Sequence, residues 1–269
     1  MEQRNYYKLK NRLESMSKEG KRGQVAIFVI IALVIVAVIL IVMFYPKLKT
    51  SFTNAPFTPE SFLRGCIEPE VNKGVILLSK QGGYANPEGF LLYNDTKIKY
   101  LCYVTGYYKT CVVQEPMILN HFEQELNNMV SPKAKDCFAK LKQEYENRGF
   151  AVTGNINDAK TGIESGKVNV EFLAPITVSK ETSQRFDKFN IQMKSELYDI
   201  LTISQSIIEF ESTYGDSETT TFIQYYPDLK IVKTKLSEGS KVYSVSNVIT
   251  KEEFTFASRS LSWPPGYAV

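Results

Sequence analysis

One apolar run constrains this 269-residue chain more than any other feature of its sequence. The 21 residues from Val25 to Tyr45 include no charged residue, no amide, no Ser or Thr and no proline. As an α-helix rising about 1.5 Å per residue, the run is roughly 31 Å long, close to the hydrocarbon thickness of a bilayer. We therefore expect residues 24–45 to form a transmembrane helix with the lipid bilayer as partner through residues 25–45, which argues against a fully soluble protein.

The charges on either side of this run predict its orientation. Residues 1–23 carry seven Lys or Arg and three Glu, which leaves 25 basic and 26 acidic residues for the rest of the chain. Basic flanks resist translocation, so we expect a basic cytoplasmic tail over 1–23 and a C-terminal part outside the cell membrane. The near-neutral balance of that part argues against a nucleic-acid partner.

We expect the run to be kept as a signal anchor. It is longer than the roughly 7 to 15 apolar residues of a cleaved secretory signal. The sequence Met43-Phe44-Tyr45-Pro46 that ends it is bulky and offers no small-x-small cleavage pattern. The sequence thus predicts a single-pass membrane protein.

The tetrapeptide Lys21-Arg22-Gly23-Gln24, directly before the run, resembles the class III signal of archaeal type IV prepilins. The resemblance implies cleavage between Gly23 and Gln24 and assembly of the apolar helix into a filament. The fifth residue after that bond is Phe28 rather than the Glu often found in pilins, and prolines between 46 and 59 interrupt a continuous stalk helix. We favour a plain anchor over a filament subunit.

The chain as a whole resembles a group of uncharacterised membrane-anchored proteins from small-genome archaeal lineages. The resemblance rests on four stretches: Lys80-Gln81-Gly82-Gly83-Tyr84, Leu101-Cys102-Tyr103, Phe256-Ala257-Ser258-Arg259-Ser260 and Trp263-Pro264-Pro265-Gly266. Because these proteins have no assigned activity, it implies a lineage and a topology but no chemistry.

Beyond the anchor, residues 46–59 form a Pro/Thr-rich stalk, and we expect residues 60–269 to form an external α+β domain with mainly antiparallel strands. A seam inside the domain is expected near 149–166. The expected helices run from Thr58-Pro59-Glu60 to Gly82-Gly83 with a kink at Pro69, over 116–130 and 132–148, and over 195–214 with an apolar stripe along one face and Gly215 as cap. The expected strands are a hairpin over 98–113 with its loop at 105–108, a strand-rich stretch over 150–180 that alternates strictly over 167–172, and a meander over 222–260 with its tip at 237–240.

All four cysteines, Cys66, Cys102, Cys111 and Cys137, follow the apolar run. An external compartment favours disulfides, and four cysteines permit three pairings. Cys102 and Cys111 face each other across the predicted hairpin, which leaves Cys66 for Cys137. Free buried thiols are the alternative; a metal site would need closer spacing, such as two Cys-x2-Cys pairs, which the sequence lacks.

Little else in the sequence points to chemistry, and we expect no catalytic residue, no cofactor and no metal. His121 is the only histidine; it lies one helical turn before Glu125 and is expected on a helix surface. Asn94 begins the sole Asn-x-Thr glycosylation sequon, Asn94-Asp95-Thr96, in an expected loop.

Two aromatic groups offer contact surfaces for a protein or glycan partner. One is a tyrosine-rich region around the predicted hairpin: Tyr84, Tyr93, Tyr100, Tyr103, Tyr107 and Tyr108. The other is Trp263-Pro264-Pro265-Gly266-Tyr267, which suits a polyproline docking peptide or packs on its own domain.

The sequence therefore favours an anchored external protein of interaction or cell-surface structural type. The alternatives are a pilin-like filament subunit and a membrane-tethered solute-binding or enzymatic module. Its oligomeric state stays open.

Overall fold

A computed structural model of the chain describes residues 29–37 and 57–261 and divides the chain into two compact units, Met1–Phe57 and Thr58–Val269. In the first unit, residues 29–37 are helical and their apolar side chains are exposed. Within the described residues, no helix combines the length and the apolar character needed to cross a membrane. The basic tail 1–23, the Gly23–Gln24 bond, the stalk up to residue 56 and residues 262–269 lie outside the described part.

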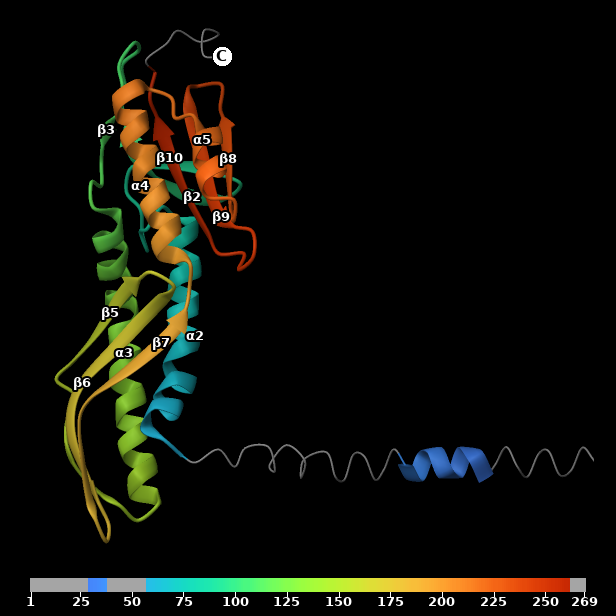
Figure 1. The fold of residues 1–269 in the computed structure, drawn as a ribbon, viewed down its shortest axis with the longest axis vertical. Coiled ribbons are helices and arrows are strands. Elements are labelled where there is room, and N and C mark those ends of the chain that lie inside the picture. Colours follow the sequence, from blue (N-terminus) through green and yellow to red (C-terminus); the bar gives the residue numbers. More distant parts are fainter. Residues whose placement is uncertain (1–28, 38–56, 262–269) are drawn as a thin grey trace, which may run out of the picture. The chain divides into compact units, whose positions relative to one another are not determined.

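The second unit is α+β with mainly antiparallel strands, as the sequence predicts (Figure 1). Its helices are α2 (Pro59–Lys80), α3 (Ile118–Asn147), α4 (Leu197–Tyr214) and α5 (Thr219–Tyr225). Its strands are β1 (Phe90–Tyr93), β2 (Thr96–Tyr103), β3 (Val112–Val113), β4 (Ala151–Gly154), β5 (Asp158–Glu164), β6 (Lys167–Ser179), β7 (Ser183–Lys194), β8 (Leu229–Lys235), β9 (Ser240–Asn247) and β10 (Glu253–Arg259).

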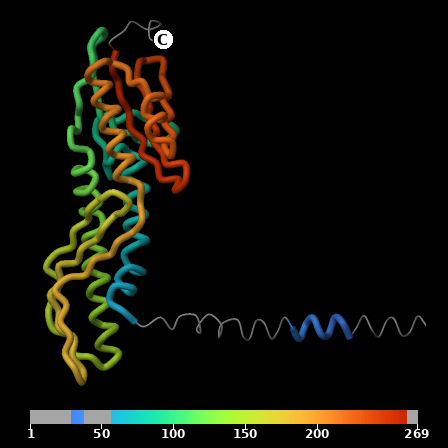
Figure 2. The backbone as a smooth tube through the Cα atoms, in the orientation of Figure 1, coloured from blue at the N-terminus to red at the C-terminus, as the bar shows by residue number. Residues whose placement is uncertain are grey.

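The helices α2 and α3 are separated by three strands in the chain but pack as an antiparallel pair that contacts both sheets (Figures 1 and 2). The Thr58 side chain caps α2 by accepting the Ser61 N–H, and Pro59 occupies the first turn, as expected. At Gly74 the helices approach so closely that a Cβ atom would lie 2.7 Å from Leu126 Cδ1. The Cys66–Cys137 disulfide joins the first half of α2 to the second half of α3, with Cα atoms 5.8 Å apart.

The prediction of two helices on either side of Pro132 is wrong, because α3 runs unbroken through this residue. A proline inside a helix leaves the carbonyl four residues earlier, here that of Asn128, without its N–H donor. Both Pro132 and Asn128 are exposed, so water can bind that carbonyl. The buried face of α3 meanwhile stays apolar on both sides of the proline. The helix α2 likewise continues through the exposed Pro69.

One sheet packs on α3 and is centred on β6. β7 pairs along one edge of β6, while β5 and β4 pair with its first and second halves. Every second residue of β6 from Val168 to Val178 is buried, which confirms the alternation expected over 167–172 and extends it to the end of the strand. The sheet starts at Ala151, close to the expected seam, yet the contact pattern places both sheets in one unit.

The other sheet has the strand order β1-β2-β10-β9-β8, with β3 also paired to β2. All its pairs are antiparallel except β2 with β10. One face packs on α4, whose apolar stripe is buried as the sequence predicts. Tyr243 and Phe256 stack in this core with ring centroids 5.2 Å apart, and Phe254 lies beside Phe256. The expected turn at 237–240 is present between β8 and β9.

The tight hairpin predicted over 98–113 is wrong in register. Cys102 pairs with Val113 rather than with Cys111, and residues 104–111 form a longer loop. Lys109 in that loop forms an antiparallel bridge with Leu261, which follows β10, and does not pair with residue 104 as the tight hairpin requires. The Cys102–Cys111 disulfide forms nonetheless, with Cα atoms 5.3 Å apart. Both disulfides expected from the sequence are therefore present, and no cysteine is free.

Loss of the helix–helix disulfide should destabilise the protein more than loss of the loop disulfide. The two bridges close loops of 71 and 9 residues, so the chain-entropy model gives about 4 kcal/mol for the first and about 2.5 kcal/mol for the second. We expect C66A/C137A to lower the free energy of unfolding in urea by about the first amount. A double variant that unfolds at the parent's urea concentration would contradict this.

Candidate functional site

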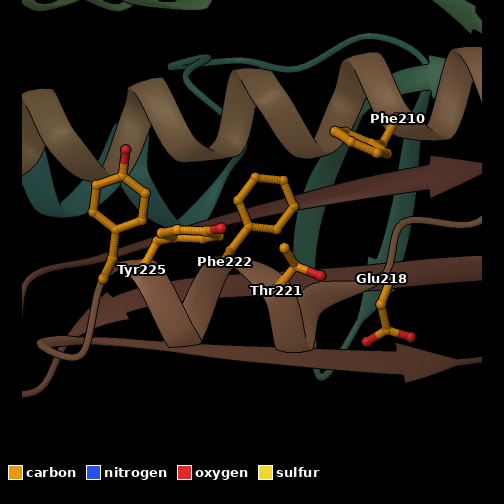
Figure 3. A pocket seen from close by; sticks show the side chains of 6 residues that line it. Phe210, Glu218, Thr221, Phe222 and Tyr225 are labelled. Atoms are coloured by element: carbon orange, nitrogen blue, oxygen red, sulfur yellow. The ribbon is translucent and has the colours of Figure 1, made fainter.

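The most distinct site is an aromatic pocket between α4 and α5. It has a volume of about 520 Å³ and is lined by Phe210, Glu218, Thr221, Phe222, Tyr225 and Tyr226. Figure 3 shows the rings of Phe222 and Tyr225 rising from α5 toward α4, which contributes Phe210. Glu218 lies at the far end of α5 with its carboxylate turned away from the rings.

The aromatic rings of the pocket contact one another but stay open to solvent. Phe210 and Phe222 meet edge to face with centroids 5.8 Å apart, and Phe210 also contacts Tyr214. The exposed fraction is 44% for Phe210, 78% for Tyr225 and 47% for Tyr226. Large aromatic side chains gathered at an open cavity are typical of a surface that binds another molecule.

The turn between α4 and α5 is specified locally. Gly215 ends α4 in the left-handed conformation with φ 83°, as the sequence predicts, and its N–H bonds to the Glu211 carbonyl. Glu218 then caps α5, because its carboxylate accepts the Thr220 N–H at 2.9 Å and the Thr220 hydroxyl at 2.6 Å. These two features set the angle at which α5 faces α4.

A buried polar cluster fixes the last turn of α4 to the sheet. The Glu211 carboxylate is fully buried and accepts bonds from Lys241 Nζ at 2.9 and 3.0 Å, from the Tyr243 hydroxyl at 2.5 Å and from the Ser258 hydroxyl at 2.8 Å. The Ser217 N–H also donates to it, so the carboxylate is well supplied with donors. Burial and the negative charge of Glu211 raise the pKa of Tyr243 far above its usual range, which keeps its phenol protonated as a donor.

Asp216 extends this cluster toward the surface. Its carboxylate lies 3.1 Å from Lys233 Nζ, 2.9 Å from Lys235 Nζ and 3.1 Å from Lys241 Nζ. Burial by itself would raise the pKa of Asp216, but the hydrogen bonds and charges of the three lysines outweigh it and lower that pKa to about 2. Asp216 is therefore ionised at neutral pH and joins β8 and β9 to the end of α4.

His121 is not a free surface residue, contrary to expectation. Its ring packs on Tyr84 with centroids 4.0 Å apart, and its Nδ1 lies 3.5 Å from a Glu115 carboxylate oxygen that also accepts the Tyr84 hydroxyl. Glu125 accepts the Ala85 N–H instead of orienting the imidazole. Burial, together with Glu115, raises the pKa of Tyr84. These contacts hold the Gly82–Gly83 turn against α3.

The tyrosine-rich region does not form one patch. Tyr100 bonds to Ser240 and contacts Tyr103, whereas Tyr107 and Tyr108 are exposed on the loop before β3. Asn94 lies exposed in the two-residue turn between β1 and β2, where both Asn94 and Asp95 have positive φ.

Two further cavities are bounded by side chains already engaged in holding the fold. In the cavity beside α2 and the start of α4, Glu252 accepts the Ser195 hydroxyl and the Glu196 N–H. In the polar cavity between α3 and β5, Asn127 accepts the Thr161 N–H and Glu123 accepts the Ile163 N–H. No group of three or more metal-binding side chains occurs among residues 29–37 and 57–261.

Comparison of the chain with protein-family models, with curated proteins and with solved structures finds no match.

Sequence reasoning missed the pocket because it missed α5. Residues 219–225 read Thr-Thr-Thr-Phe-Ile-Gln-Tyr, a β-branched and aromatic stretch. Its second half, residues 222–225, falls in the predicted meander over 222–260, and the three threonines before it are assigned to no element. The structure shows a helix there and begins the meander at Leu229. The one available signal was Glu218, a capping side chain directly before the three threonines.

Removal of Lys241 should destabilise the protein severely. In K241M the Glu211 carboxylate would stay buried without its cation, and breaking a buried pair in this way costs roughly 3–5 kcal/mol. The matched control is K235M, because Lys235 is 42% exposed and its pair with Asp216 is worth at most about 1 kcal/mol. Urea unfolding at neutral pH measures the stability of both variants. Equal decreases in the free energy of unfolding would contradict the assigned role of Lys241.

Acid should remove the contribution of Asp216 to the free energy of unfolding within a defined pH range. Its pKa is about 2 in the folded state against 3.8 ordinarily, so the unfolded chain binds the proton first. The stabilisation is at most about 2 kcal/mol, because solvent screens the partly exposed lysines around Asp216. It is present above pH 4 and lost as the pH falls toward 2. We expect D216N to flatten this part of the stability profile, whereas D187N, which alters a 75% exposed carboxylate, should leave it unchanged.

Proposed function

We propose that this chain is a single-pass membrane protein that holds its α+β domain outside the cell and acts by binding a partner through the pocket between α4 and α5. Residues 25–45 serve as the anchor and residues 1–23 stay in the cytoplasm. The observation that carries the proposal is the pocket, an open aromatic cavity of about 520 Å³ on a firmly supported helix end.

The disulfides support an external location for the domain. Both bridges lie after the apolar run, and residues 1–24 contain no cysteine. Disulfides persist in oxidising compartments and are rare in the cytosol. Together with the basic residues before the run, they favour an N-terminus inside and a domain outside.

The chemistry of the pocket supports binding of an apolar partner. Among the described residues its lining is mainly aromatic, and the carboxylate that lines it, Glu218, is engaged in capping α5. Aromatic faces with two tyrosine hydroxyls suit an apolar or proline-containing segment of another chain.

A filament subunit is the second candidate, and the Lys21-Arg22-Gly23-Gln24 sequence favours it. In this case the chain would be cut after Gly23, and residues 25–45 would pack among copies of themselves. The external domain would then be displayed on a filament rather than on single anchors.

Topology can be tested by labelling introduced cysteines in intact cells, because the native cysteines are paired and Cys102, Cys111 and Cys137 are buried. A membrane-impermeant maleimide should label D187C in intact cells, since the Asp187 side chain is 75% exposed. A cysteine introduced by S17C is the matched control, because it should react only after lysis. A D187C cysteine that reacts only after lysis would overturn the external location.

The intact mass of the membrane-extracted protein distinguishes the two candidates. A chain that keeps residues 1–23 supports the permanent anchor. A mature N-terminus at Gln24 would contradict it and favour the filament subunit.

A further inference from the structure

The short helix α5 is capped by Glu218 and contacts β8 and Phe210, but it buries none of its own residues. It spans seven residues, none of which is buried. Isolated helices below about 12 residues are marginal in water, and helices in proteins derive most of their stability from packing. The aromatic side chains that α5 and its C-cap present, Phe222, Tyr225 and Tyr226, line an open cavity instead. We therefore expect another segment to cover this aromatic surface.

The last described residues lie beside the wall of this pocket. The Ser260 hydroxyl donates to the backbone carbonyl of Glu211 at 3.1 Å, and Glu211 directly follows Phe210 in α4. The next residue, Leu261, is held by backbone bonds in both directions with Lys109. The described chain thus ends next to Glu211, the residue that follows Phe210 of the pocket wall in α4.

The sequence that follows has the length to reach along α5. The six residues from Ser262 to Tyr267 extend roughly 20 Å at about 3.3 Å per residue. In a polyproline II conformation with about 3.1 Å per residue, Trp263 to Tyr267 spans about 12 Å. A seven-residue helix is about 10 Å long. The two lengths therefore match.

The chemistry of that sequence also fits the pocket. Proline-rich segments in the polyproline II form bind in aromatic-lined grooves, because their conformation is largely fixed before binding. Trp263-Pro264-Pro265-Gly266-Tyr267 has two adjacent prolines between large aromatic residues. Burying one such aromatic side chain removes about 150–250 Å² from water. The pocket offers the rings of Phe210, Phe222 and Tyr225 as the opposing surface.

We propose that residues 262–267 of this chain bind in the α4–α5 pocket of the same molecule, with the Trp263-Pro264-Pro265 stretch against the aromatic rings. The segment then covers α5 and completes the packing that the described residues leave open. This inference rests on the proposed function only in taking the pocket as the binding surface; it adds that a partner must displace the chain's own segment.

The experiment uses Trp263 as its probe, because it is the only tryptophan in the chain. In the full-length protein we expect a blue-shifted emission and several-fold weaker acrylamide quenching than for free tryptophan. Y225A, alone and combined with F222A, should shift the emission to the red and raise quenching toward the value of free tryptophan. Tyr225 is highly exposed, so Y225A should leave the fold intact, which far-ultraviolet circular dichroism verifies.

The matched control is L92A. Leu92 is also exposed, at 64%, but lies on β1, the opposite edge of the sheet from β8 and α5. We expect L92A to leave the emission unchanged. A shielded Trp263 that Y225A and Y225A/F222A do not affect would overturn the proposal and place the indole elsewhere, for instance in detergent or lipid. An indole already solvent-exposed in the parent protein would overturn it as well.

Dilution separates binding within one molecule from binding between two copies. Occupation by the same chain predicts emission and quenching that do not depend on protein concentration. A red shift on dilution would overturn the proposal in favour of exchange between copies. These readouts do not depend on which side of the membrane the domain faces, so failure here and failure of the proposed topology are distinguishable.

Discussion

The buried ion pair between Glu211 and Lys241 is the interaction on which the candidate site depends. Glu211 ends the buried stripe of α4, and its carboxylate is reached by groups from β9, β10 and the turn after α4. A buried carboxylate is tolerated only when cations and hydrogen-bond donors surround it. The groups that satisfy Glu211 therefore fix the last turn of α4 in one position on the sheet. Since Phe210 is the neighbouring residue, the pocket takes its position from this cluster.

The antiparallel pair of helices α2 and α3 supports the domain as a whole. It contacts both sheets, and the Cys66–Cys137 disulfide links its two helices. The close approach at Gly74 and the buried apolar faces keep the helices in register. The sheet next to the pocket thus packs on the same helix pair as the other sheet. Rigid support of this kind suits the binding role that we propose for the domain.

Sequence reasoning was most successful where the physical signal is local and repeated. The Thr58-Pro59 start of α2, the apolar stripe of α4 with its Gly215 cap and the alternation of β6 each repeat one rule over several residues. It failed where distant contacts outweigh local preference. Pro132 was expected to open a second helix after a break, but the helix runs through it because the exposed position lets water satisfy the freed carbonyl. Residues 222–225 were expected to begin a meander of strands, but the Glu218 cap and the contact of Phe222 with Phe210 accompany a helix.

The sequence by itself determined the α+β class, the main helices and the two cysteine pairs, and it predicts an anchor over residues 25–45. These follow from hydrophobic periodicity, capping residues and chain spacing, which are readable along one dimension. Only the tertiary structure decided the register around Cys102, the parallel pairing of β2 with β10 and the convergence of Glu211, Asp216 and Lys241. It also decided the pocket, because Phe210 and Phe222 meet only once α4 and α5 are packed. Contacts between residues far apart in the chain depend on how elements pack, and no local pattern encodes that choice.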